Sequence, residues 1–222
     1  MDTQRTRTWA EISLSALRHN VKELTGVLPS GCALMGVVKA DAYGHGSIPV
    51  AAVLRESGCQ YLAVACPEEA FALRQAGETL PILILGAVDA AFAPRLAEQG
   101  IAQAVECLEK GKALSAALAP GQKLKIHIKL DTGMGRLGFT VREETALAEA
   151  AAVTALPGLE TEGVSPISPY RTPPEARTIP GNSSPFSPPQ RTSWSAGAGR
   201  GSLCATAPTP GRCCPSGRRA LP

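Results

Sequence analysis

Two kinds of segment alternate along the first three quarters of the chain, and this alternation most constrains the fold. Six short apolar or β-branched runs, bounded by Gly, Pro or polar residues, predict strands over residues 33–38, 61–65, 82–85, 102–105, 124–130 and 159–164. Helices are predicted over residues 13–27, 45–57, 67–76, 90–98, 107–118 and 143–155. A strand followed by a helix, repeated in this way, is typical of an α/β fold with a parallel sheet.

Two closures of such a sheet compete. An open doubly wound sheet would bind a dinucleotide through a G-x-G-x-x-G turn after the first strand, and the sequence has no such turn there. A (β/α)8 barrel needs about eight units and some 250 residues, more than the six predicted units supply. The pattern alone leaves the closure open.

The alternation stops after Val164. Residues 165–222 contain twelve of the nineteen prolines and seven arginines, but no lysine and a single acidic residue, Glu175. A segment with few apolar residues and no period of 2 or 3.6 cannot offset its chain entropy by burial. We therefore expect a folded part over residues 1–164 and a disordered tail over residues 165–222. The arginines are scattered rather than clustered, so a nucleic-acid-binding arm is the weaker interpretation of the tail and no nucleic-acid partner is expected.

Several classes of protein are disfavoured. No apolar run reaches the roughly 18 residues of a membrane helix, and the N-terminal segment lacks the apolar core of a signal peptide. We expect a cytoplasmic protein without a membrane partner, whose cysteines stay reduced. Cys32, Cys59, Cys66 and Cys107 have no C-x-x-C spacing, and the three histidines do not cluster with them, so no metal site is expected.

Lys39 ends the first predicted strand, in the segment MGVVKADAYGHG. A lysine there points into the mouth of the sheet, where partial loss of water would free its amine as a nucleophile. The alternative is a lysine that simply reaches solvent past the strand end. Tyr43 follows in a glycine-flanked turn that could meet an anion, although an ordinary strand-to-helix loop explains the turn equally well.

Lys125, His127 and Lys129 alternate with apolar residues, so one face of their strand is charged. A solvated face on an edge strand is the simplest interpretation; inside a barrel these groups would need partners. Three glycines surround Arg136 in the next segment, LDTGMGRLGF, which indicates a tight loop. Arg136 could clamp a carboxylate with its bidentate guanidinium.

Three segments together, TWAEISLSALRHNV, VVKADAYGHG and KLDTGMGRLGF, in this order and separation, resemble the alanine racemases. The resemblance runs from about Thr8 to Val164. It implies the N-terminal portion of a (β/α)8 barrel, with about six of the eight units and without the family's C-terminal β-domain. It also implies a pyridoxal 5′-phosphate cofactor, alanine as substrate and, in the family, a homodimer.

The resemblance also implies roles for four residues. Lys39 matches the family's Schiff-base lysine, which also moves a proton on one face of the substrate. Tyr43 matches the tyrosine near the cofactor phosphate, and Arg136 the arginine beside the cofactor's phenolic oxygen and the substrate carboxylate. Lys129 matches a lysine that is carbamylated in several members. No residue of this chain matches the second base, a tyrosine from the partner subunit's β-domain. We therefore expect no racemase activity from the chain itself, and its dimerisation is in doubt.

The tail can be read as an out-of-frame peptide. Loss of one base converts codons for VFTHFAVSD, a family-like continuation, into the observed residues 164–172. The same shift converts codons for LRHCANSGAVL, which resembles a later barrel segment of the family, into residues 204–214. A single-base loss near codon 165 would explain both the composition and the abrupt join. Two other readings stay open: a related pyridoxal-phosphate barrel enzyme, either a broad-specificity amino-acid racemase or a decarboxylase, and a non-catalytic cofactor-binding protein.

Overall fold

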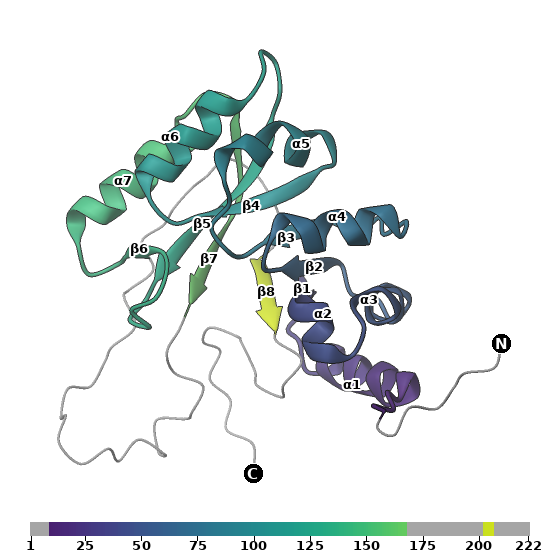
Figure 1. Ribbon diagram of the computed structural model, residues 1–222. Helices are drawn as coiled ribbons and strands as arrows, with labels where there is room; N and C mark the ends of the chain where they lie inside the picture. The colour runs from purple at the N-terminus through teal and green to yellow at the C-terminus, as the bar shows by residue number, and fades with distance from the viewer. Residues whose placement is uncertain (1–8, 168–201, 207–222) are drawn as a thin grey trace, which may run out of the picture.

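The structure, a computed structural model, describes residues 9–167 and the backbone of one further strand, Ser202–Thr206 (Figure 1). None of the helices within these residues combines the length and the apolar character needed to cross a bilayer.

The sheet is parallel and follows the order of the chain. Strands pair in the succession β1 (Cys32–Val37), β2 (Tyr61–Val64), β3 (Ile82–Ile84), β4 (Ile101–Val105), β5 (Leu124–Asp131) and β7 (Leu159–Ile167). A doubly wound sheet reverses its strand order at a switch point, whereas this order never reverses, as in a barrel. All six predicted strands are confirmed, and the fold is an incomplete (β/α) barrel.

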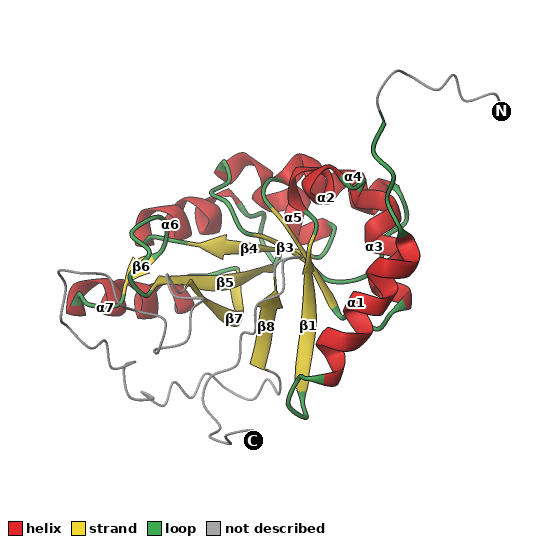
Figure 2. Ribbon diagram, turned by 90° about the horizontal axis from the view of Figure 1, so that it is seen from below, coloured by secondary structure: helices red, strands yellow, loops and turns green. Residues whose placement is uncertain are grey.

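Two strands were not predicted. β6 (Phe139–Thr140) pairs with the end of β5, and β8 (Ser202–Thr206) pairs in parallel with β1, on the side that faces β7 (Figures 1 and 2). β7 also extends three residues past the expected boundary at Val164, and Thr132 Oγ1 donates a 2.6 Å hydrogen bond to the carbonyl of Ile167. The expected disorder of residues 168–201 and 207–222 lies outside the described residues.

Helices cover the outer face of the curved sheet (Figures 1 and 2). They confirm the predicted segments, with one split into a 3-10 turn and a short helix: α1 (Leu14–Gly26), α3 (Ser47–Glu56), α4 (Pro67–Gln75), η1 (Ala90–Phe92), α5 (Ala93–Glu98), α6 (Leu108–Ala117) and α7 (Glu144–Thr154). Individual residues explain where two of these helices begin. Ser13 accepts from the N–H of Ala16 at the start of α1, and Pro67 fills the first position of α4, where its missing N–H costs nothing.

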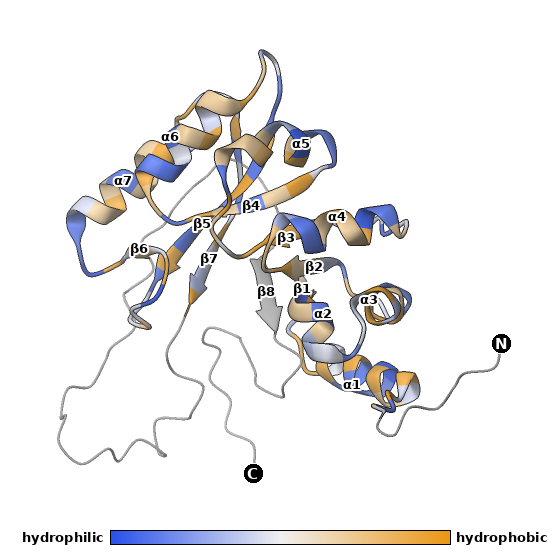
Figure 3. Cartoon of the chain, viewed as in Figure 1, coloured by the Kyte–Doolittle hydropathy of each residue, from blue (hydrophilic) through white to orange (hydrophobic). Residues whose placement is uncertain are grey.

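Two apolar layers surround the strands. The larger lies between sheet and helices and includes fully buried Leu62, Ile84 and Leu114. A smaller inner cluster lies on the opposite face: Met35, Ala63, Leu83, Ala102 and Ala104. Figure 3 shows hydrophilic segments within β5, on strands that are otherwise largely apolar. The interpretation of β5 as an edge strand is wrong, because β4 and β7 pair with it on its two sides and bury His127 and Lys129.

Candidate functional site

Lys39 lies where β1 ends and the short element α2 (Lys39–Gly44) begins. The preceding residue, Val38, still belongs to the sheet, because its N–H donates a 2.8 Å hydrogen bond to the carbonyl of Ala63 at β2. The Lys39 side chain is half-buried, and its Nζ lies 5.9 Å from the centre of the Tyr43 ring. The lysine thus stays at the carboxyl end of the strands, as predicted.

The segment after Lys39 is a left-handed turn. The four residues from Ala40 to Tyr43 have φ between 50° and 55°, and none of them is glycine. The left-handed conformation costs an L-residue roughly 1–2 kcal/mol, so the surrounding contacts must offset several such terms. Asp41 supplies one of these stabilising contacts, since its Oδ1 accepts a 2.6 Å hydrogen bond from the N–H of Ser47.

Lys129 and Arg136 complete a cationic group with Lys39. Lys129 is 5% exposed on β5. Burial lowers its pKa most and the charge of Arg136 lowers it next; Glu106 then opposes the shift, Lys39 adds a smaller lowering effect, and Asp131 opposes it least. Since both charges act on the Lys129 ammonium, Lys39 and Arg136 each lie within electrostatic range of Lys129.

The loop that carries Arg136 is held by Asp131. The carboxylate of Asp131 accepts backbone hydrogen bonds from Gly133, Met134 and Arg136 at 2.7–2.8 Å. These bonds lower the pKa of the carboxyl. Gly138 closes the loop with φ +128°, and a Cβ there would lie 2.8 Å from both the Asp131 nitrogen and the Lys129 oxygen. Gly138 of the predicted tight loop therefore has a steric reason, whereas Gly133 and Gly135 meet the loop's need for positive φ.

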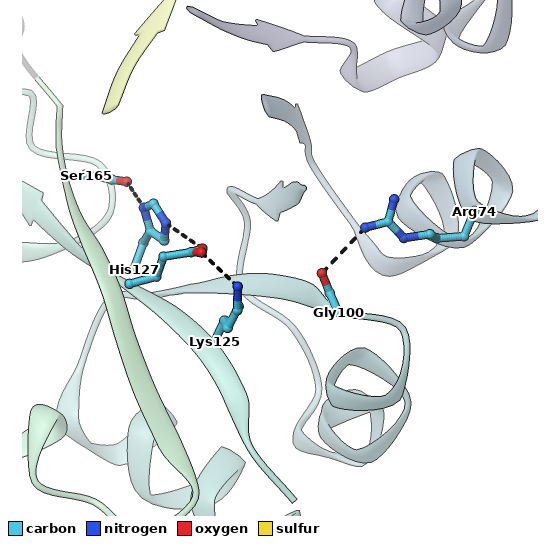
Figure 4. A network of polar contacts seen from close by, with 6 residues as sticks. Arg74, Gly100, Lys125, His127 and Ser165 are labelled. Atoms are coloured by element: carbon cyan, nitrogen blue, oxygen red, sulfur yellow. Dashed lines mark hydrogen bonds and ion pairs between the residues drawn. The ribbon is translucent and has the colours of Figure 1, made fainter. Parts of the chain in front are cut away.

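A second polar layer lies farther back along β5. His127 Nδ1 is 3.2 Å from the Ser165 hydroxyl, and His127 Nε2 is 3.5 Å from a carboxylate oxygen of Glu162. Lys125 contacts the other oxygen of that carboxylate at 3.0 Å (Figure 4). The histidine and then the lysine lower the pKa of Glu162 to about 2. Gly163 allows this packing, because a Cβ there would lie 2.9 Å from the imidazole.

Figure 4 also shows Arg74, whose guanidinium hydrogen-bonds backbone carbonyls of neighbouring strand–helix units. Its guanidinium donates to the carbonyls of Glu78 and Leu80 at 2.8 Å and reaches Gly100 at 3.5 Å. Burial lowers its pKa. Arg74 is a structural residue that joins α4 to the turns before β3 and β4.

The charged groups suit an anionic cofactor. Within the described residues, Lys39, Lys129 and Arg136 make no ion pair with a carboxylate at 4 Å or less, and the nearby Asp131 is already satisfied by backbone N–H groups. A primary amine, a tyrosine hydroxyl and two further cations match an aldehyde that carries phosphate and phenolate oxygens. The residues present therefore fit pyridoxal phosphate.

Three residues near the site were not predicted as functional. Asp131 holds the Arg136 loop, and Glu106, whose pKa is raised by burial, acts on the charge of Lys129. Glu69 hydrogen-bonds the backbone of Ala40 beside Lys39. The only sequence signal of Glu69 was its place at the start of a predicted helix, and that signal is explained equally well by the helix alone.

Comparison with known proteins identifies the family of the chain. The chain matches the family described as alanine racemase, N-terminal domain, over residues 12–170. It is 46% identical over 164 residues to an alanine racemase of Desulfosudis oleivorans, covering 70% of this chain and 42% of that protein.

Solved structures agree. An alanine racemase of Clostridium difficile superposes with a TM-score of 0.68 at 36% identity, covering 74% of this chain and 43% of that one. A histidine racemase of Leuconostoc mesenteroides gives 0.61 at 32% identity, covering 66% and 39%. The chain spans about two fifths of the length of these relatives. With the confirmed barrel order and the motifs around Lys39 and Arg136, these matches show that the chain belongs to the alanine racemase N-terminal domain family.

Proposed function

We propose that residues 1–164 form the lysine-bearing part of a pyridoxal-phosphate-dependent racemase that interconverts L-alanine and D-alanine. One observation carries the proposal: Lys39 lies at the carboxyl end of β1 and acts electrostatically on Lys129, as does Arg136, with no carboxylate partner for these cations among the described residues. Such a group binds an anionic aldehyde and holds an amine next to it. The family name of the relatives supports alanine as the substrate.

Each residue has a defined task in this proposal. The Lys39 amine would hold the cofactor through its aldehyde group and would move a proton at the substrate α-carbon. The bound cofactor supplies an electron sink for the carbanion. Tyr43 would contact the cofactor phosphate, and Arg136 would bind the phenolic oxygen and the substrate carboxylate.

Lys129 has a second chemistry in the proposal. Burial and two neighbouring cations lower its pKa, which favours a neutral amine. That amine can add to carbon dioxide, forming a carbamate and releasing one proton. The product would be an anion, so that its electrostatic interaction with Arg136 would become attractive instead of repulsive. Incubation with ¹³C-labelled bicarbonate should give a carbamate carbon resonance that is lost in Lys129→Ala.

The 222-residue chain is proposed to bind the cofactor weakly and to lack turnover. Its sequence has no match to the tyrosine that works on the second face of the α-carbon, and the family homodimer would form through the β-domain. A cytoplasmic location is proposed with it. Racemisation of alanine by the purified 222-residue chain would overturn the proposed inactivity.

The first test is covalent trapping. The chain is mixed with pyridoxal phosphate, reduced with borohydride and digested, and the modified peptide is found by mass spectrometry. We expect the label on Lys39 and its loss in Lys39→Ala, with unchanged background at exposed Lys22. Equal labelling of all lysines would contradict the proposed site.

We propose separately that a single-base loss near codon 165 shifted the reading frame that encodes residues 165–222. Sequencing the DNA across codons 160–170 tests it. A restored base that opens the reading frame through the two family-like segments would support it, and an unaltered frame with no racemase-like sequence in the shifted reading would oppose it.

A different amino-acid substrate is the second candidate, favoured by the similarity to the histidine racemase. A chain extended in the restored reading frame, so that it carries the second base, would be assayed with alanine, histidine and other amino acids. Release of carbon dioxide would be the sign of a decarboxylase. Trapping at Lys39 without turnover of any of them, in a chain that carries the second base, would indicate a non-catalytic cofactor-binding protein.

A further inference from the structure

We propose that Glu69 is a positioning residue for Lys39, and that it acts by clamping the backbone next to the lysine to the end of the neighbouring strand. The proposal rests on the proposed role of Lys39 as the cofactor-bearing lysine. Glu69 touches none of the reacting groups itself; it acts through the main chain.

The contact is a bridge made by one carboxylate. Glu69 Oε1 accepts a 2.7 Å hydrogen bond from the N–H of Ala40, and Oε2 accepts a 2.7 Å hydrogen bond from the N–H of Ala65. Ala40 directly follows Lys39, whereas Ala65 directly follows β2. Two strand–helix units are thus joined at the edge of the sheet where Lys39 leaves it. Both bonds are short and have an ionised acceptor, which makes them stronger than bonds between neutral groups.

Capping of α4 explains only one of the two hydrogen bonds that Glu69 accepts. Glu69 lies in the first turn of α4, and a glutamate there commonly reaches back to an N–H just before its own helix, as Oε2 does to Ala65. The bond to Ala40 spans 29 residues and serves no helix end of α4. A role limited to capping would leave Oε1 in solvent.

The bridge acts where the backbone is strained. Ala40 is the first of the four left-handed residues, and it is exposed, so burial does not hold it in place. The direction of the Lys39 side chain depends on the path of the chain on either side of it. Before the lysine, the sheet bond from Val38 to Ala63 fixes that path; after it, the Glu69 bond fixes it. Ala42 N–H also bonds the carbonyl of Val38 at 2.9 Å, and Asp41 holds Ser47, so loss of Glu69 releases the start of the turn at Ala40 from the end of β2 while the rest of the turn keeps its bonds.

The main test is amide exchange at Ala40. In the unsubstituted chain, we expect the Ala40 N–H to be protected although the residue is exposed. Glu69→Gln keeps the shape of the side chain but replaces one accepting oxygen with an NH2 group, and Glu69→Asp is too short to span both donors. Each should raise exchange at Ala40 or Ala65 by about tenfold, the effect of losing one charge-assisted hydrogen bond. Glu68→Gln is the matched control, since Glu68 is exposed and lies on the same helix turn.

The second readout is trapping of pyridoxal phosphate at Lys39, relative to trapping at Lys22. We expect several-fold slower trapping in Glu69→Gln, no change in Glu68→Gln and unchanged helix content by circular dichroism. An unprotected Ala40 amide in the unsubstituted chain would overturn the proposal without any variant. So would normal exchange and normal trapping in the Gln and Asp variants. Failure of trapping in the unsubstituted chain would instead overturn the proposed function, while the exchange measurement would still decide the role of Glu69.

Discussion

The carboxylate of Asp131 accepts a 2.8 Å hydrogen bond from the backbone N–H of Arg136, so the last residue of β5 fixes the loop that carries the arginine. Two more N–H groups of that loop bond to the same carboxylate. The side chain of Arg136 is exposed, and its position therefore depends on this loop rather than on packing around the guanidinium. Asp131 and Arg136 form one unit, in which the carboxylate of the first residue holds the backbone of the second.

Asp131→Asn should loosen this loop, because an asparagine offers one accepting oxygen where the carboxylate offers two. We expect several-fold faster tryptic cleavage after Arg136 in the folded chain. Asp89→Asn is the control, since Asp89 also accepts a backbone N–H, at 2.8 Å from Ala91, but does so far along the chain at η1. Cleavage after Arg136 that stays at the original rate in Asp131→Asn would show that other contacts hold the loop.

Gly138→Ala should destabilise the protein for two reasons that can be separated. Both Gly138 and Gly121 have positive φ, but a Cβ at Gly138 would lie 2.8 Å from backbone atoms, whereas one at Gly121 would meet nothing within 4 Å. Gly121→Ala should therefore cost about 1 kcal/mol from the conformation alone. Gly138→Ala should cost at least about 1 kcal/mol more, by analogy with overpacking in cores. Urea unfolding of both variants measures the difference, and equal losses would contradict the steric argument.

The sequence was sufficient for the regular part of the fold, and it singled out the cations Lys39, Lys129 and Arg136, whose role at a site stays a prediction. Apolar runs such as residues 82–85 are too short for a helix and fit buried strands, and their spacing leaves room for one helix each. The closure was not decided by this pattern, since an open sheet and a barrel use the same units. It is the pairing of consecutive strands without a reversal that decides it.

The parts that could not be predicted depend on contacts between distant residues or on backbone conformations that the residue types disfavour. Nothing in the sequence of Ala40 or Ala42 indicates a left-handed turn, because alanine prefers the right-handed region. The apolar-and-charged alternation around His127 fits a solvated edge as well as a barrel interior, and only the pairing of β5 with β7 distinguishes them. The role of Glu69 depends on its hydrogen bond to Ala40, 29 residues away, which no local sequence pattern indicates.

Glu162 should make stability depend on acid pH. Its pKa is about 2 instead of 4.5, so the ionised form is favoured in the folded state, mainly by His127 and Lys125. A depressed carboxyl pKa contributes stability that is complete above pH 4.5 and is lost as the pH falls toward 2. Glu162→Gln should therefore lower the free energy of unfolding by on the order of 2 kcal/mol at neutral pH. The gap between variant and unsubstituted chain should narrow steadily below pH 4.5.

Urea unfolding at neutral pH and at about pH 3 measures this gap. Glu56→Gln serves as the control, because Glu56 pairs with Arg18 at 3.2 Å on the surface, with both side chains about half exposed. An exposed pair of this kind contributes only about 0–1 kcal/mol. If the gap for Glu162→Gln is the same at both pH values, the carboxylate is not the source of its stabilising effect.

Arg136→Gln should raise the pKa of Lys129. Burial is the largest cause that lowers this pKa, and the charge of Arg136 is the next, so removing the arginine leaves a more basic amine. At a fixed neutral pH, Lys129 should then be more protonated and should react more slowly with an acylating reagent. The measurement is the pH at which Lys129 is half-labelled, determined by mass spectrometry of its peptide.

Two comparison variants accompany this measurement. Lys39→Ala should shift the half-labelling pH in the same direction but by less, because the charge of Lys39 acts more weakly on Lys129 than the charge of Arg136. Arg55→Gln, on exposed α3 surface, should leave it unchanged. A half-labelling pH that falls or stays the same in Arg136→Gln would separate Arg136 from Lys129 and remove the electrostatic basis for pairing the arginine with a carbamate on that lysine.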